Sequence, residues 1–407
     1  MTDRTKRVID ACRTIATMSE EPSRTTRSFL TPPVREVHEF LHSRMEALAM
    51  SVTVDAVGNL RGLWKPNEAS ANRLILGSHI DTVPAAGAFD GVLGVALALE
   101  LVESARRLRL PLAIEVIAFS EEEGVRFGFP FIGSRAVAGR LDPPMLAFKD
   151  ADGVSIRGAI EAWGLDPDAV PEAAAADDSV GFVEFHIEQG PVLEVEGLSI
   201  AAVSSIVGQT RLDLRFIGHA NHAGTTPMRL RHDALASTAE WIAKVESLAR
   251  GTEGLMATVG KVHVQPNAPN VIPGVVEASL DVRHVRDSVR RNAVDELIEA
   301  AEAIAGRRGL KFESTLKMDQ ASVPMDQRLT AFLSDAMEAA SFPPKLMASG
   351  AGHDAMIMAG RLPATMLFLR SPGGISHHPD ETVREEDVEA ALRVGEKFLE
   401  RLAAEVG

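Results

Sequence analysis

The chain has a single cysteine, no long apolar run and no cluster of basic residues, and each absence excludes a class of protein. Cys12 alone cannot form an intrachain disulfide or a thiolate metal cage, which fits a reducing compartment, so we expect a cytoplasmic protein. No stretch approaches the roughly twenty apolar residues that span a bilayer, and residues 1–30 lack the apolar core of a signal peptide. We therefore expect no membrane association.

The charge balance argues against a nucleic-acid partner. The chain has 42 basic and 57 acidic residues, a net charge of −15, and no Lys/Arg cluster that could neutralise a row of phosphates. Its hydrophobic content of 45% is that of an ordinary globular protein, and 407 residues are enough for two domains. Composition thus indicates a globular protein without a nucleic-acid partner.

Apolar patterning predicts an α/β fold for the first part of the chain. Residues 33–49 have helical spacing, and 73–77 form a short β-rich segment that leads into His79. An apolar helix is expected over 91–101 and a buried strand over 112–119. Strands and helices alternate, as they do in α/β folds.

The middle of the chain has a different order of elements. We expect strand 209–217, helix 233–248, strands 257–264 and 275–282, helix 288–305 and strand 310–316. This βαββαβ order is the ferredoxin-like pattern, and its length is that of a domain. Because 365–369 reads as a further core strand, we expect a catalytic metal-binding domain formed by 1–207 and 318–407, with an inserted lid or dimerisation domain at 208–317.

Histidines and acids recur at or soon after the ends of apolar strands, although they lie far apart in the sequence. The carboxyl ends of parallel strands are where α/β sheets place their chemistry, so we expect these residues to converge. A set of histidines and carboxylates without cysteine suits Zn, Mn, Co or Ni. The candidates are His79, Asp90, Glu122, Glu123, His186 and His377.

Each candidate also has a structural interpretation. His79 and Asp81 share a strand face, so Asp81 can orient a metal-bound His79, but a buried histidine bonded to its neighbour would give the same pattern. Asp90 precedes a glycine and an apolar helix, which is typical of an N-cap as well as of a carboxylate that bridges two cations. The run 121–123 is either a solvated acidic loop or a metal ligand beside a general base.

Six segments resemble the hydantoinase/carbamoylase branch of the M20 metallopeptidase-like superfamily, which covers N-carbamoyl-L-amino acid hydrolases, allantoate amidohydrolases and β-ureidopropionases. They follow one another in the same order over nearly the whole chain. The segments are GSHIDTVP (77–84), FDG (89–91), EEGVRF (122–127), HIEQG (186–190), HAGTTPM (222–228) and SHHP (376–379). Such a series identifies the chain as a member of this branch.

The resemblance implies two divalent metal ions bridged by Asp90. The other implied roles are His79 and His186 on one ion, Glu123 and His377 on the other, Glu122 as general base and Asp81 as support of His79. Exopeptidase and aminoacylase relatives usually carry a carboxylate at the place of His186, so this histidine favours the amidase branch, which hydrolyses ureido groups. Glu121 has no role in this scheme, and we expect it to be solvated.

The inserted domain would supply substrate contacts. By the same resemblance, His222 and Asn270 polarise the scissile carbonyl and Arg283 binds the substrate carboxylate with its two-pronged guanidinium. Gln209 belongs to this polar set, and His353 lies in a segment that resembles an active-site loop. Closure of the lid would assemble the site. Inserted domains pair in this family, so we expect a homodimer, with His222 or Asn270 serving either its own or the partner's site.

We therefore expect a metal-dependent amidohydrolase that cleaves the C–N bond of a ureido group on a small carboxylate substrate, such as an N-carbamoyl-L-amino acid or allantoate. The alternatives are an aminoacylase or dipeptidase, and a non-catalytic binding protein of the same fold. A complete set of ligands, together with Glu122 as an intact general base, argues against the second alternative.

Overall fold

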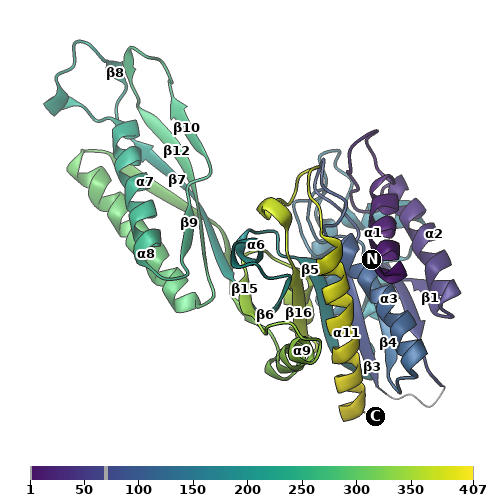
Figure 1. The fold of residues 1–407 in the computed structure, drawn as a ribbon. Helices are drawn as coiled ribbons and strands as arrows, with labels where there is room; N and C mark the ends of the chain where they lie inside the picture. Colours follow the sequence, from purple (N-terminus) through teal and green to yellow (C-terminus); the bar gives the residue numbers. More distant parts are fainter. Residues whose placement is uncertain (1, 68–71, 407) are drawn as a thin grey trace. The chain divides into compact units, whose positions relative to one another are not determined.

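The computed structural model describes residues 2–67 and 72–406 and forms two compact units (Figure 1). The larger unit consists of Met1–Ser204 and Met325–Gly407, and the smaller unit of Ser205–Pro324. The insert predicted from the sequence, 208–317, lies within the smaller unit. The outer ends of the predicted catalytic domain, residues 1 and 407, lie outside the described residues.

A nine-stranded sheet runs through the larger unit in the order β1-β2-β4-β3-β5-β16-β6-β14, with β15 also paired to β6. The strands are β1 (Ser51–Val54), β2 (Leu60–Trp64), β3 (Arg73–His79), β4 (Ala113–Phe119), β5 (Ser179–Ile187), β6 (Ile200–Ile206), β14 (Val323–Pro324), β15 (Leu346–Ser349) and β16 (Ala364–Leu369). The four central strands β4, β3, β5 and β16 are mutually parallel, and β1, β2, β6 and β14 pair antiparallel with their neighbours. The carboxyl ends of the four parallel strands therefore meet at one edge of the sheet.

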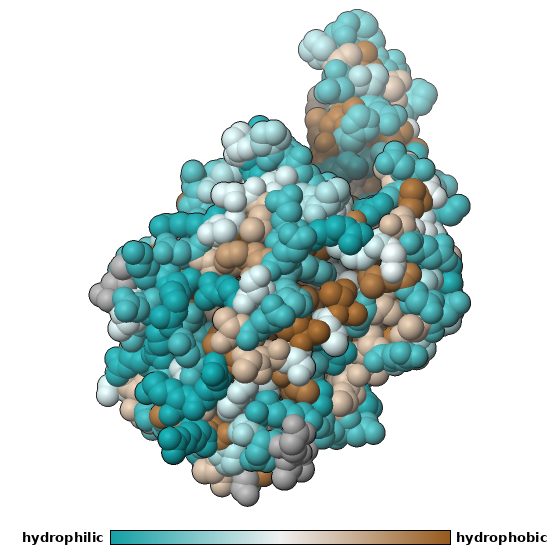
Figure 2. Space-filling model, turned by 90° about the vertical axis from the view of Figure 1, so that its right-hand side faces the viewer, coloured by the Kyte–Doolittle hydropathy of each residue, from teal (hydrophilic) through white to brown (hydrophobic). Residues whose placement is uncertain are grey.

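Helices cover both faces of this sheet, which confirms the predicted α/β class. They are α1 (Asp3–Ala16), α2 (Pro32–Ala47), α3 (Val92–Leu108), α4 (Ile132–Val137), α5 (Ile156–Trp163), α6 (Val192–Glu196), α9 (Gln327–Ala339), α10 (Asp354–Met358) and α11 (Glu385–Val406), with 3-10 turns at Pro143–Ala147, Pro167–Ala173 and Pro372–Gly374. Among the described residues, no helix has the length and apolar character needed to cross a bilayer. Figure 2 shows hydrophilic side chains over much of one face, with small apolar groups between them.

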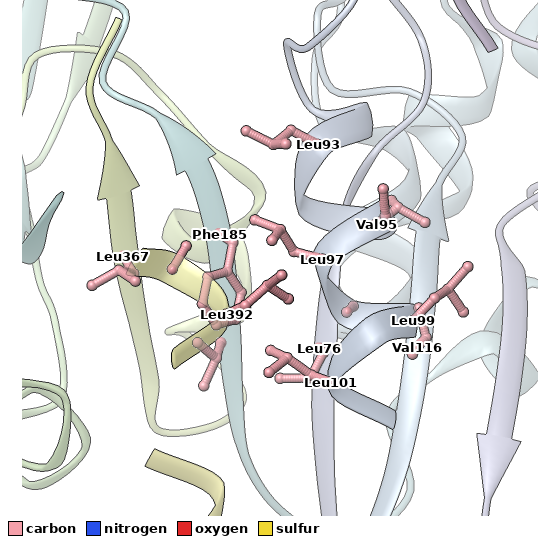
Figure 3. Close-up of a cluster of buried hydrophobic side chains, with 14 of the residues drawn as sticks. Leu76, Leu93, Val95, Leu97, Leu99, Leu101, Val116, Phe185, Leu367 and Leu392 are labelled. Atoms are coloured by element: carbon pink, nitrogen blue, oxygen red, sulfur yellow. The ribbon is translucent and has the colours of Figure 1, made fainter. Parts of the chain in front are cut away.

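Helix α3 is the central helix of the core. It is apolar nearly all round, which is typical of a buried helix, and it packs on β3, β4 and β5. Figure 3 shows Leu97 and Leu101 of α3 close to Phe185 of β5 and Leu392 of α11. A Cβ at Gly94 would lie 2.3 Å from the carbonyl oxygen of Phe185, so the first turn of α3 lies directly against the sheet. This contact places the residues before α3 at the carboxyl edge.

The smaller unit has an antiparallel sheet in the order β10-β12-β7-β13, with β9 also paired to β12. The elements are β7 (Gly208–Ile217), α7 (Ala234–Gly251), β9 (Met256–Thr258), β10 (Val262–Gln265), β12 (Val275–His284), α8 (Asp287–Arg307) and β13 (Lys311–Gln320). A ribbon of β8 (Asn221–His222) and β11 (Val271–Ile272) and a 3-10 turn (Met228–Leu230) complete it. Alternate residues of β7 and β12 are buried against α7 and α8.

One predicted strand of this unit is wrong. Residues 257–264 form the two short strands β9 and β10, which pair with opposite ends of β12, β10 with 275–278 and β9 with 281–283. The residues between them include Gly260, which has no side chain to pack and weakens a strand interior. The apolar residues also change phase here, from positions 257 and 259 to positions 262 and 264, which marks the break in the ladder.

Candidate metal centre

The candidate ligands converge at the carboxyl edge of the four parallel strands. His79 is the last residue of β3 and His186 lies one residue before the end of β5. The Nε2 atoms of these two histidines lie 3.4 Å apart, and that of His186 lies 3.2 Å from Asp90 Oδ1. All three side chains are almost fully buried. They form one group whose donor atoms could hold a single cation.

A second group shares Asp90. The Nε2 atom of His377 lies 3.2 Å from Asp90 Oδ2 and 3.5 Å from Glu123 Oε1. Asp90 therefore directs one oxygen towards each group, which is the arrangement of a carboxylate that bridges two cations. Two further groups of potential ligands overlap with these, His79-Glu122-Glu123 and Glu184-His186-His353.

Hydrogen bonds to the two buried imidazoles direct their Nε2 atoms at one point. His79 Nδ1 lies 3.0 Å from the carbonyl oxygen of Asp81, and His186 Nδ1 lies 2.9 Å from that of Ile187, so each Nδ1 carries a proton. If both rings are neutral, two Nε2 lone pairs face each other, and only a proton or a cation between them relieves the repulsion. This geometry fits a bound metal ion.

The pKa shifts of the two histidines agree with one shared positive charge. Burial opposes the charging of His79, but hydrogen bonding to Asp81 and the nearby carboxylates raise the pKa of its ring well above the ordinary value. Burial lowers the pKa of His186 to about 4, so this ring stays neutral. One proton, on His79, can lie between the two Nε2 atoms and relieve their repulsion, and a bound divalent cation would take the place of this proton.

Asp81 supports both the histidine and the acidic loop. Its main-chain oxygen accepts the closer hydrogen bond from His79, while its carboxylate lies 3.4 Å from the same Nδ1. The two carboxylate oxygens accept the backbone N–H groups of Glu122 and Glu123 at 2.9 and 3.0 Å. Asp81 therefore ties the end of β3 to the loop after β4.

The N-cap interpretation of Asp90 does not hold in the structure. The N-cap of α3 is Gly91, and no side chain caps this helix, so the carboxylate of Asp90 is directed at the imidazoles instead. Gly91 has φ 66°, and a Cβ there would lie 2.5 Å from Nε2 of His79. Only glycine lets the backbone approach the histidine this closely.

The acidic run is buried, which contradicts the expectation that Glu121 is solvated. Glu121 has no exposed surface, and burial followed by the charge of Asp81 raises the pKa of its carboxyl well above the usual value. Burial also raises the pKa of Glu122 well above normal and that of Glu123 to about 7, with a neighbouring carboxylate adding to each shift. The run predicted closely spaced acids, but not the direction of each side chain. Such a concentration of buried carboxyl groups is relieved by cations.

Two residues that the sequence analysis did not single out contact the centre. Gln189 Nε2 donates to both oxygens of Asp90, at 3.1 and 3.2 Å. Glu381 Oε1 accepts the backbone N–H groups of Phe89 and Asp90, each at 3.0 Å. Gln189 lies within the HIEQG segment and Glu381 follows SHHP, so their only sequence signal was proximity to a candidate histidine.

His353 lies behind the candidate ligands. Its ring packs edge-on against that of His186 with centroids 4.5 Å apart, and its Nε2 is 2.9 Å from Ser349 Oγ. Burial lowers the pKa of His353 well below the ordinary value. A buried, neutral ring in this position orients His186, and a substrate contact by His353 stays a prediction.

The four substrate candidates of the smaller unit form two pairs. Gln209 and Arg283 are cross-strand neighbours on β7 and β12, and Asp281 accepts hydrogen bonds from both side chains. His222 pairs through β8 with Val271, next to Asn270, whose carbonyl accepts the N–H of Ala223 at 3.0 Å. The structure therefore does not gather all four at one place.

The two pairs lie at opposite ends of β7. Gln209 is near the start of this strand, while the β8–β11 ribbon follows its last residue, Ile217, and precedes the start of β12 (Figure 1). Eight residue steps at the usual rise separate the ends by about 25 Å. In the ribbon, His222 Nδ1 accepts the N–H groups of Gly224 and Thr225, so its proton lies on Nε2, as carbonyl polarisation requires.

Comparisons with known proteins agree on one family. The family "Peptidase family M20/M25/M40" matches residues 75–401. The N-carbamoyl-L-amino acid amidohydrolase of Geobacillus stearothermophilus is 38% identical over 372 residues, covering 91% of each chain, and the allantoate amidohydrolase of Escherichia coli (strain K12) is 36% identical, covering 93% of each. The crystal structure of a hydantoinase/carbamoylase family amidase from Burkholderia multivorans superposes with a TM-score of 0.91 at 31% identity, over 98% of this chain and 97% of that one.

Proposed function

Because the chain belongs to peptidase family M20/M25/M40, within its hydantoinase/carbamoylase branch, we propose that it is a metal-dependent amidohydrolase that cleaves the C–N bond of a ureido group on a small carboxylate substrate. The named relatives act on N-carbamoyl-L-amino acids and on allantoate, and these two are the substrates that we propose. The observation that carries the proposal is Asp90, a buried carboxylate whose two oxygens are directed at two separate groups of candidate ligands.

The centre would hold two divalent cations, with Zn, Mn, Co and Ni as the candidates. Asp90 would bridge them, and the remaining ligands would be His79 and His186 for one cation and Glu123 and His377 for the other. When bound, divalent cations supply Lewis-acid polarisation of a carbonyl and make water more acidic. All donors are imidazole or carboxylate, the ligand types that these metals accept.

Glu122 is the residue that we propose as general base. It is buried beside Glu123 and belongs to a group of potential ligands with His79. It does not belong to either of the two groups that share Asp90, so it lies next to the proposed ligands without being one of them. Burial raises the pKa of its carboxyl above the ordinary value. A carboxylate in this place could take a proton from water and return it to the leaving nitrogen. Asp81 keeps its backbone in place through the N–H bond described above.

We propose a preference for ureido over acyl substrates because a histidine at position 186 resembles the amidase branch, whereas exopeptidase and aminoacylase relatives usually carry a carboxylate there. The test is a set of paired compounds, N-carbamoyl-L-amino acids with their N-acetyl counterparts and allantoate, given to metal-free protein that has been reloaded with each of the four metals. We expect the ureido compound of each pair to be hydrolysed faster. Faster cleavage of the N-acetyl compounds would instead identify an aminoacylase.

We also propose that the protein acts as a homodimer in the cytoplasm. A small carboxylate substrate is far shorter than the distance between the two polar pairs of the smaller unit, so one copy of this unit cannot present both pairs to one substrate molecule. This supports a division in which one pair serves its own chain and the other serves the partner. The buried free thiol of Cys12 suits a reducing compartment.

Mixed dimers test this division. Glu122→Gln and His222→Ala chains would each be inactive alone, but in a mixed dimer one site has an intact Glu122 and receives the intact His222 of the partner subunit. Random assortment of equal amounts should restore about a quarter of the wild-type activity. If His222 serves its own chain, the mixture stays inactive.

A further inference from the structure

Glu381 connects two loops that carry proposed ligands. It lies in the loop after His377, and its side chain is only 5% exposed. Its Oε1 atom accepts the backbone N–H groups of Phe89 and Asp90, and its Oε2 atom accepts the hydroxyl of Ser376 at 3.2 Å. One carboxylate thus holds the backbone of Asp90 and the residue before His377 at a fixed separation.

The backbone around Glu381 is shaped for this contact. A Cβ at Gly87 would lie 2.3 Å from Cβ of Glu381, so the loop before Asp90 packs directly on the glutamate. On the other side, the N–H of Glu381 donates to the carbonyl of His378 at 3.0 Å, which closes a turn next to His377. His377 itself has φ 55°, a left-handed conformation that a non-glycine residue keeps only when its surroundings enforce it.

The two groups of ligands differ in how they are supported. His79 and His186 end neighbouring parallel strands, and the first turn of α3 holds Asp90 through the bonds from Val92 N to Asp90 O and from Leu93 N to Phe89 O. His377, by contrast, belongs to an irregular loop and is 48% exposed. The group with Asp90, Glu123 and His377 therefore depends on a contact between loops, whereas the other group depends on the sheet.

We propose that Glu381 is a positioning residue that sets the separation of Asp90 and His377 and thereby the affinity for the cation bound by Asp90, Glu123 and His377. This inference rests on the proposed metal centre. Residues that orient metal ligands from behind commonly change metal affinity by about 10- to 100-fold when they are replaced. The effect of losing Glu381 should fall on one of the two cations, because α3 and the sheet hold the other ligand group without it.

The experiment is a calorimetric titration of metal-free protein with Zn²⁺ or Co²⁺. The wild type should bind two cations in resolvable steps. In Glu381→Ala, the weaker step should lose about 10- to 100-fold in affinity while the tighter step stays within a few-fold. Glu381→Gln should stay close to the wild type in both steps, because its amide oxygen still accepts the two N–H groups and its amide nitrogen can donate to Ser376.

A matched control separates positioning from charge. Glu385→Ala removes a carboxylate from an exposed position in the same segment, at the start of α11, and should leave both steps unchanged. If Glu381→Ala does not fold, Glu381→Asp replaces it, because its carboxylate is one methylene too short to reach Asp90. Ser376→Ala removes only the bond at Oε2 and should weaken the same step by a smaller factor.

Three results separate the inference from the proposed function. The positioning role would be overturned if the weaker step were unchanged in folded Glu381→Ala or Glu381→Asp, or if both steps were weakened equally. In that case, two cations bound by the wild type would still support the proposed dinuclear centre. Failure of Glu381→Gln to restore the weaker step would likewise count against a role through hydrogen-bond geometry. A wild type that binds fewer than two cations would instead overturn the dinuclear centre itself.

Discussion

In the larger unit, buried carboxylates and imidazoles gather at the carboxyl ends of four strands. In the smaller unit, most charged side chains lie on the solvent-facing side of the sheet, and the other side of that sheet is apolar and packs against helices. Glu121, Glu184 and Asp354 have no exposed surface in the larger unit. In the smaller unit, typical pairs such as Arg215 with Glu313, 3.1 Å apart, are partly exposed at both partners. The same kinds of side chain are thus placed in opposite environments.

This difference indicates where each unit keeps its chemistry. Exposed ion pairs contribute little to stability and are easily replaced. Buried carboxyl groups without enough compensating charge are costly, and a protein retains them where a cation or a reaction needs them. The one fully buried arginine of the described smaller unit, Arg290, is paired with Asp287 and Asp319 and so follows the ordinary rule. The carboxyl edge of the larger sheet departs from that rule.

The largest expected effect separates a buried glutamate from an exposed one. Glu122→Gln removes the proposed base without changing its shape, and kcat should fall by about 10²- to 10⁴-fold. The control is Glu277→Gln, which removes a half-exposed partner of Arg215 in the smaller unit and should leave kcat unchanged. Steady-state hydrolysis of an N-carbamoyl-L-amino acid measures both, and near-normal kcat in Glu122→Gln would mean that another group takes the proton.

Removal of cations should destabilise one unit only. At cation concentrations of 100 to 1,000 times the dissociation constant, binding adds about 3 to 4 kcal/mol to stability, and a chelator would remove this from the larger unit. Trp64 and Trp163 report on that unit, while Trp241, fully buried between α7 and the sheet, reports on the smaller one. Urea unfolding of a Trp64→Phe/Trp163→Phe variant should therefore be insensitive to the chelator. A chelator-dependent Trp241 signal would show that the two units unfold together.

Two glycines provide the next comparison. Gly91→Ala forces a side chain into left-handed backbone and against the ring of His79, and should cost about 2 to 4 kcal/mol and weaken cation binding. Gly306 lies in α8 of the smaller unit with open space around it, so Gly306→Ala should stabilise by about 0.5 to 1 kcal/mol. Denaturant midpoints measure both. A neutral Gly91→Ala would mean that the loop before α3 relaxes easily.

The last prediction concerns a buried histidine away from the candidate centre. Burial lowers the pKa of His38 to about 4, and its ring packs edge-on against Trp163. Between pH 6.5 and 4, His38 binds a proton in the unfolded chain but stays neutral in the folded chain. The contribution of the neutral, buried ring to stability is therefore present at neutral pH and is lost on acidification. Between pH 7 and 5 the loss is about 2 kcal/mol. Unfolding of the metal-free protein followed at Trp163 measures it, and His38→Gln should flatten the slope.

Pattern and propensity were sufficient for most of the elements. Helix α3 and strand β4 followed from apolar stretches, and the αβ alternation followed from their order. The failures were local in origin. Residues 257–264 were read as one strand although the apolar residues change phase at Gly260, and an acidic run does not reveal which side chain turns inward. Glu121 is therefore buried where solvent exposure was expected.

The sequence by itself determined which residues could take part in metal chemistry, because histidines and carboxylates at the ends of parallel strands must share one edge of a sheet. Only the tertiary structure decided how they are held: that Asp90 is directed at two groups rather than capping α3, and that Glu381 fixes its backbone. The physical reason is range. Strand periodicity is a property of neighbouring residues, whereas these hydrogen bonds join segments about 290 residues apart that meet only when the sheet and its helices have packed.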